Sequence, residues 1–301
     1  MNICYISECN FYDEDGVTVI DTVPTDFGKV PVAPAAPEKP GYTFVGWTYN
    51  GTTYAPGQTF TMPNGAIYLE GEFVADEFDA VFYATGGYFG SDETATTATV
   101  KVFYDDIGTS PAKPVRSGYE FLGYTDTEGS ASIVLQANAA FTMDAEGKTY
   151  YAVWKATIAD YTIEYYEMAV DGTYPAAPTS STTRSGNVEG TVTAPVNVPT
   201  GFTLDEEDAV TAEKSILSGT VTPAPNNLVL KVYYSRNQYS VYTVVDSVKT
   251  EAGKFFFGAD VTVADPPAKE GYTAVWSPAV TSPMEAQDQE LTAVYTAVNY
   301  T

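Results

Sequence analysis

Hydrophobic and polar side chains alternate along many short segments of this chain, and turn-forming residues separate the segments. In Thr99–Tyr104, for example, TVKVFY places like residues on the same face of an extended strand. Further runs of this kind are Ile67–Leu69, Tyr150–Trp154, Tyr161–Tyr166, Leu228–Tyr234, Tyr239–Val245 and Leu291–Tyr295. Gly and Pro punctuate the intervals, which is typical of β-proteins. The pattern predicts a β-rich fold, all-β to α+β.

Turns and connections are predicted at defined places. Asp15-Gly16 follows an aromatic pair and precedes Val17–Ile20, so it predicts a hairpin, and Asn50-Gly51 predicts a second one. The proline-spaced segment Val30–Pro40 is unsuited to a central strand, so we expect it to cross the domain as an extended connection. Leu204–Ser218 is the best helical candidate of the chain.

One heptapeptide recurs and organises the whole chain. Gly41–Trp47 (GYTFVGW) returns as Gly118–Tyr124 (GYEFLGY), Gly271–Trp276 (GYTAVW) and, more weakly, Gly201–Leu204 (GFTL). Prolines precede each copy, and the lead glycines are 77, 83 and 70 residues apart. Such a period indicates an array of small domains.

The repeats predict four small domains at 1–77, 78–157, 158–237 and 238–298. Linkers of only a few residues predict an elongated, semi-rigid rod. Residues 299–301 (NYT) are similar to Asp160–Thr162 (DYT), which opens the third repeat. We therefore expect them to begin a further repeat or a linker, and the chain to be a fragment of a longer array.

Composition narrows the possible functions. The 301 residues include 14 basic and 39 acidic side chains, a formal charge of −25, and no histidine. Such a charge repels nucleic acid and anionic lipid. Without histidine, Ser-His and Cys-His pairs cannot form. No apolar run is long enough to span a membrane. We expect no catalysis and no cofactor, and predict no catalytic, cofactor-binding or metal-ligating residue.

The repeated motif carries a family resemblance. Pro37–Trp47, followed by the Thr-Met turn of Phe60–Pro63, resembles the Listeria–Bacteroides repeat, also called the internalin B-repeat. The second repeat matches with Tyr124 in place of Trp. The fourth lacks the second glycine but keeps Trp276 and Met284. The third repeat, with its Tyr-rich strands, looks more like mucin-binding-protein repeats.

The resemblance implies a β-grasp-like fold, no catalytic residues, and tandem stalks in large surface proteins of Gram-positive and gut bacteria. The expected function is therefore a non-catalytic spacer that projects a binding domain from the cell wall, with signal and anchor outside this fragment. One alternative is an adhesin whose repeats bind host glycan or surface protein. Another is a filament or biofilm matrix subunit whose copies associate through sheet edges.

Four groups of residues could carry a site. Acidic runs at Asp13–Asp15 and Asp205–Asp208 lack the spaced ligand pattern of calcium loops, so turn chemistry and helix-start acids explain them better. Tyrosine pairs invite glycan binding, but alternation directs one member of each pair to the core. The pairs are Tyr150-Tyr151, Tyr165-Tyr166 and Tyr233-Tyr234.

Two covalent links are also considered. Intramolecular isopeptide bonds could involve Lys101, Lys155 or Lys231, but lysines in strands usually face water. Cys4 and Cys9 could form a disulfide only if Ile6–Glu8 turned, so a cysteine packed in the first repeat is the simpler prediction.

Overall fold

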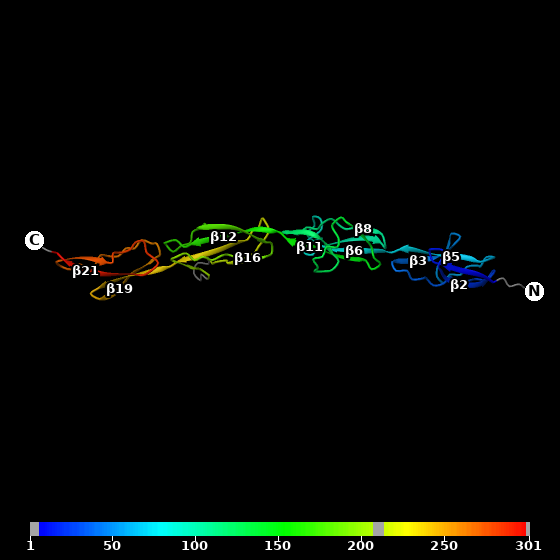
Figure 1. Ribbon diagram of the computed structural model, residues 1–301, viewed down its shortest axis with the longest axis horizontal. Helices are drawn as coiled ribbons and strands as arrows, with labels where there is room; N and C mark the ends of the chain where they lie inside the picture. Colours follow the sequence, from blue (N-terminus) through cyan, green and yellow to red (C-terminus); the bar gives the residue numbers. More distant parts are fainter. Residues whose placement is uncertain (1–5, 207–213, 299–301) are drawn as a thin grey trace, which may run out of the picture. The chain divides into compact units, whose positions relative to one another are not determined.

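The computed structural model describes residues 6–206 and 214–298 of the chain. Every regular element among these residues is a β-strand (Figure 1). The chain divides into two compact units, Met1–Lys155 and Ala156–Thr301, and each is described by itself. Within the described residues no helix has the length and apolar character to cross a membrane. The β-rich fold class is confirmed.

The strands follow the repeats of the sequence. The first repeat contains β1 (Ile6–Tyr12), β2 (Val19–Asp26), β3 (Tyr42–Tyr49), β4 (Thr52–Tyr54) and β5 (Ile67–Ala75). The second contains β6 (Glu77–Tyr83), β7 (Thr97–Phe103), β8 (Ile107–Thr109), β9 (Tyr119–Thr125), β10 (Ala140–Thr142) and β11 (Lys148–Ala156).

The third repeat contains β12 (Ile158–Glu167), β13 (Ser180–Asn187), β14 (Thr191–Thr193), β15 (Phe202–Leu204), β16 (Ser218–Thr220) and β17 (Val229–Arg236). The fourth contains β18 (Gln238–Val245), β19 (Val248–Phe256), β20 (Tyr272–Ser277) and β21 (Gln289–Ala297).

All four main sheets have the same strand order. The orders are β2-β1-β5-β3, extended by β4, then β7-β6-β11-β9, β13-β12-β17-β15 and β19-β18-β21-β20. In each, the opening hairpin is antiparallel, and the first and last strands pair in parallel at the centre. Parallel neighbours require a long crossover. A mixed sheet of this order is β-grasp-like, as the sequence predicts.

Each sheet buries one face beneath its own crossover connection. In the first repeat, Phe11 and Leu69 from the two central strands are fully buried, and Met62 from the crossover is buried against the same cluster. The corresponding Met143 and Met284 are each 1% exposed in their own clusters. The recurring Thr-Met and Pro-Met turns therefore supply the methionine that closes the cores of the first, second and fourth repeats.

The last aromatic residue of the motif fixes the proline-spaced connection to the sheet. The indole Nε1 of Trp47 donates to the carbonyl of Pro34 at 3.1 Å, and that of Trp276 donates to Ala264 at 2.8 Å. In the second repeat the hydroxyl of Tyr124 makes the equivalent contact with Ala112 at 3.4 Å. Each ring thus finds a partner for its polar atom on the proline-spaced connection.

The second glycine of the motif gives room to the strand that crosses it. A Cβ on Gly46 would lie 2.8 Å from the backbone oxygen of Tyr54 in β4. A Cβ on Gly123 would lie 2.5 Å from Ile133, beside the segment where Leu135 bridges Tyr124. Any larger residue would push this extra segment off the sheet.

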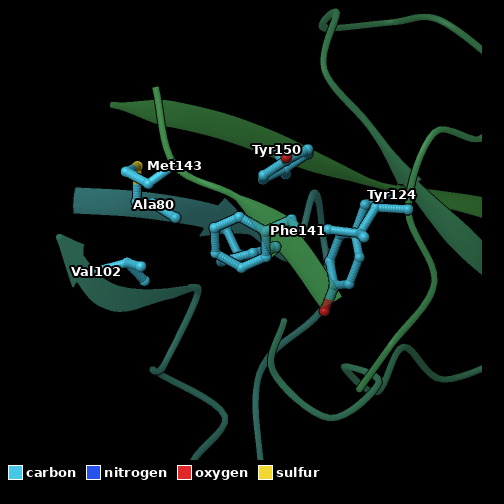
Figure 2. Packing of buried hydrophobic residues seen from close by; sticks show 9 residues of the cluster. Ala80, Val102, Tyr124, Phe141, Met143 and Tyr150 are labelled. Atoms are coloured by element: carbon cyan, nitrogen blue, oxygen red, sulfur yellow. The ribbon is translucent and has the colours of Figure 1, made fainter. Parts of the chain in front are cut away.

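The second repeat shows how aromatic rings fill such a core (Figure 2). Phe82 stacks on Tyr150 with ring centroids 4.9 Å apart, and Tyr124 meets Phe82 edge-on at 5.1 Å. Phe141 from the crossover joins this group, and Met143 lies beside Ala80 and Val102. These contacts form one contiguous core between the four-stranded sheet and the crossover connection that carries β10.

Several local predictions are confirmed and one is not. Asp15-Gly16 and Asn50-Gly51 form the turns of the β1–β2 and β3–β4 hairpins. The ends of the predicted helix are extended: Leu204 closes β15, and Ile216 bridges Lys231 shortly before β16. Sheet pairing overrode the helical composition there, while residues 207–213 lie outside the described residues. The division into four domains at the predicted boundaries stays a prediction.

Cys9 lies in the first core with no exposed surface and carries a free thiol. Because Ile6–Tyr12 is a strand, the turn needed for a Cys4–Cys9 disulfide is absent from 6–8; Cys4 itself lies outside the described residues. Burial raises the pKa of the Cys9 thiol from 9.0 to about 12. The structure thus bears out a packed cysteine.

We predict that Cys9 resists thiol reagents until the first repeat unfolds. In a Cys4→Ser variant at pH 8, the raised pKa alone lowers the thiolate fraction roughly 1,000-fold relative to an unfolded thiol, and burial blocks access as well. Labelling measured by mass spectrometry with and without urea checks this, and fast labelling of the native protein would contradict it. The unfolded thiol ionises near pH 9 while the folded one stays neutral, so stability should fall as pH rises from about 9 towards 12.

Candidate functional site: the joints between repeats

The first and second repeats are connected by a single residue whose backbone is bonded on both sides. Asp76 follows β5 and donates its N–H to the carbonyl of Gly41 at 2.9 Å. Its own carbonyl accepts the N–H of Tyr104, the residue after β7, at 2.8 Å. Thr43 donates its hydroxyl to the Asp76 carboxylate. We call these residues, together with Tyr42, the first joint.

Ring packing completes the first joint. Tyr104 of the second repeat lies directly over Gly41 of the first, where a Cβ would come within 2.4 Å of the ring. The same ring meets Tyr42 edge-on, with centroids 5.3 Å apart. The lead glycine, with φ of 83°, therefore has two functions: it turns the chain and it receives the neighbour's ring.

The third and fourth repeats are connected in the same way. Asn237 donates its N–H to Gly201 and accepts the N–H of Phe257, both at 2.9 Å. Thr203 donates to the Asn237 side chain at 2.7 Å. A Cβ on Gly201 would lie 2.3 Å from the Phe257 ring, which meets Phe202 edge-on at 6.2 Å. These residues form the second joint.

Scarce positive charges lie over the first aromatic residue of each motif. Lys39 lies 4.0 Å from the ring centre of Tyr42, Arg116 3.6 Å from Tyr119, Arg236 4.6 Å from Phe202 and Lys269 4.9 Å from Tyr272. Arg236 also donates to the carbonyls of Met168 and Phe257, both at 2.8 Å, and so ties two repeats together. A cation over a ring face is stabilising. The chain has only 14 basic residues, and four of them lie over the same position of the motif.

The acidic runs do not converge on a metal site in the residues that the structure describes. Asp15 accepts the N–H groups of Val17 and Thr18, each at 2.8 Å, and the Thr18 hydroxyl at 2.7 Å. These hydrogen bonds lower the pKa of Asp15, with the Thr18 hydroxyl contributing most. Asp205 accepts the hydroxyl of Tyr174 at 2.8 Å, whereas Glu207 and Asp208 lie outside the described residues. Turn chemistry thus accounts for Asp15.

The tyrosine pairs behave differently in the two units. Tyr150 is buried, while Tyr151 faces outward and stacks on Tyr83 with centroids 5.3 Å apart, as alternation predicts. In the third repeat, Tyr234 lies in the core, as alternation predicts for one member of the pair, and Tyr233 is buried as well. The loop before β13 covers the outer face there: Tyr174 meets Tyr233 edge-on at 5.0 Å.

The lysine candidates lie on the surface side of their strands. The ammonium of Lys101 is 2.9 Å from Asp79 and 3.6 Å from Glu77, and its side chain is 61% exposed. Lys155 is exposed, and the Lys231 ammonium lies 5.7 Å from the ring centre of Tyr166. The Lys101 geometry is that of an ordinary exposed ion pair.

Comparison with known proteins agrees with the fold. Residues 10–69 match the Listeria–Bacteroides repeat domain, and residues 111–158 match the divergent InlB B-repeat domain. Two segments of the chain therefore match internalin B-type repeats. The chain is 28% identical to internalin H of Listeria monocytogenes over 182 residues, which is 60% of this chain and 28% of that protein.

Other relatives are membrane proteins by name. A putative membrane protein of Evansella cellulosilytica is 28% identical over 159 residues, covering 51% of this chain and 22% of its own length. A putative Gly-rich membrane protein of the same organism is 26% identical over 132 residues, 42% of this chain and 14% of its own. This chain thus spans less than a third of the length of each of these relatives. B-repeats of surface proteins describe its general class.

The sequence indicated only one side of each joint between repeats. The lead glycine and its aromatic neighbour recur visibly, but the ring that covers them comes from the residue after the second strand of the next repeat. Tyr104 and Phe257 differ in identity and lie 28 and 20 residues beyond Asp76 and Asn237. The detectable signal would have been an aromatic residue at the end of each opening hairpin.

We predict that Gly41→Ala destabilises the protein more than Gly57→Ala. Both glycines have positive φ, 83° and 77°, so both variants carry the same backbone strain. Only at Gly41 does the new methyl also meet Tyr104, because nothing lies within 4 Å of a Cβ on Gly57. The extra loss should be about 1–3 kcal/mol, measured by urea denaturation. Equal losses would show that the Tyr104 contact contributes nothing.

Proposed function

We propose that this chain is a spacer segment of a bacterial surface protein, which projects a binding domain away from the cell wall without catalysing a reaction. The observation that carries the proposal is the joint. A single residue separates the sheets of adjacent repeats at Asp76 and at Asn237, and its N–H, its carbonyl and its side chain are all hydrogen-bonded. Such a connection resists swivelling, as a spacer requires.

The B-repeat family and the acidic surface also support a spacer. A formal charge of −25 keeps such segments soluble and discourages side-by-side association. Repeat proteins of this kind obtain stability from each unit and from each nearest-neighbour contact. A repeat of roughly 75 residues is small for independent folding, so an ordered joint adds stability as well as direction.

An adhesin is the second candidate, and one surface favours it. Tyr83 and Tyr151 stack on the outer face of the second sheet, with rings 5.3 Å apart and 12° from parallel. Thr85, Gly86 and Glu128 line a shallow pocket beside them. Exposed aromatic faces with neighbouring polar groups suit the stacking of sugar rings.

A loosened joint tests the spacer proposal. Inserting Gly-Ser-Gly-Ser between Asp76 and Glu77 breaks the first joint, so small-angle X-ray scattering should show a shorter mean maximal dimension. The same insertion after Gly129, in an exposed turn with nothing within 4 Å of a Cβ, is the matched control and should leave the dimension unchanged. A globular scattering profile for the unaltered protein, or equal effects of the two insertions, would refute the proposal.

Glycan-array measurements distinguish the adhesin. The spacer proposal predicts no saturable binding, and therefore no effect of Tyr83→Ala or Tyr151→Ala. Saturable binding that either variant abolishes, while Tyr68→Ala at another exposed tyrosine leaves it intact, would instead assign a glycan site to the second repeat.

A further inference from the structure

In three of the repeats an aromatic residue directly follows the second strand, and the register of the strands shows that these positions are equivalent. We call this residue the covering ring, and the lead glycine that it packs on in a joint the receiving glycine. Tyr104 follows β7, in which Phe103 pairs with Glu77; Phe257 follows β19, in which Phe256 pairs with Gln238. In the first repeat, Asp26 at the end of β2 pairs with Ile6, so Phe27 stands at the same position. The three positions are therefore equivalent.

A second contact confirms the equivalence. The residue after each of these rings donates its N–H to the buried methionine's carbonyl: Asp105 to Met143 at 3.1 Å, Gly258 to Met284 at 2.8 Å and Gly28 to Met62 at 3.1 Å. Phe27 is nevertheless 66% exposed, whereas Tyr104 and Phe257 are partly buried in their joints. The first repeat thus displays a covering ring at the surface.

The fourth repeat has the other half of a joint, a lead glycine that no ring covers among the described residues. Val298 donates its N–H to the carbonyl of Gly271 at 2.8 Å, as Asp76 does to Gly41 and Asn237 to Gly201. Gly271 has the same positive φ, 79°, but no atom of the described chain lies within 4 Å of where its Cβ would be. Its neighbour Tyr272 is 42% exposed, against 8% for Phe202 in the second joint.

We propose that Phe27 and the Gly271–Tyr272 pair are the two halves of a further joint, each of which binds another B-repeat. Phe27 covers the lead glycine of a repeat joined ahead of the first. Gly271 receives the aromatic residue that ends the opening hairpin of a repeat joined directly after Val298. The partner is defined by the chemistry of the two joints already described: a ring over a glycine, and a backbone N–H that donates to the linker carbonyl.

The contact belongs to repeats within one polypeptide. One ring against one glycine is far smaller than the total of on the order of 1,200 Å² that a stable complex of separate chains buries. A covalent connection supplies the missing affinity, because a neighbouring repeat is present at an effective concentration in the millimolar range. For the same reason, the exposed halves do not by themselves predict a filament of separate copies.

A tandem protein tests the proposal. When Ile6 of a second copy follows Val298 of the first directly, Val298 occupies the place of Asp76, and Phe27 of the second copy occupies that of Tyr104. The N–H of this Phe27 should then donate to the Val298 carbonyl. We expect its hydrogen exchange, measured by NMR, to be at least tenfold slower than that of Phe27 in the single chain.

Matched variants of the tandem protein make the test specific. Gly271→Ala in the first copy should abolish the protection of Phe27, because its methyl occupies the place of the ring, whereas Gly57→Ala in the same copy should preserve it. Equal exchange in tandem and single chain would overturn the proposal. Concentration-dependent protection in the single chain, accompanied by dimers in sedimentation, would overturn the assignment to one polypeptide and indicate a second copy instead.

Discussion

A sheet with only one buried face is the constraint on which this structure depends. No helix among the described residues covers these cores, so the crossover connection must do so. Within that connection, short pairings such as β8–β10, β14–β16 and the bridge between Val32 and Thr59 give it some backbone partners of its own. The hydrogen bonds from Trp47, Tyr124 and Trp276 to its carbonyls, and the methionine that closes the core, hold it in place.

The two glycines of the motif solve different steric problems. Gly46 and Gly123 admit a segment of their own repeat, whereas Gly41 and Gly201 admit a ring of the next repeat. One short motif thus specifies both the fold of a unit and its attachment to a neighbour. Small units that gain stability from nearest-neighbour contacts are typical of repeat proteins.

The charge distribution follows the same arrangement. With 39 acidic residues against 14 basic ones, most positive side chains could be expected to form surface ion pairs. Ion pairs do form, and in addition Lys39, Arg116, Arg236 and Lys269 each lie over the first aromatic residue of a motif; Lys39 does both, because it also pairs with Glu14. The cations shield apolar rings near the repeat ends, while the remaining acidic surface keeps the chain soluble.

The sequence by itself determined the main strands, the opening turns, the repeat period and the packed Cys9, because alternation, turn chemistry and recurrence are local properties. Only the tertiary structure showed that a loop covers Tyr233. It also showed that the two ends of Leu204–Ser218 are extended. It alone brought Tyr104 over Gly41 and Phe257 over Gly201. Those contacts join residues far apart in the sequence, and strand register, which no single repeat reveals, determines which side chains meet.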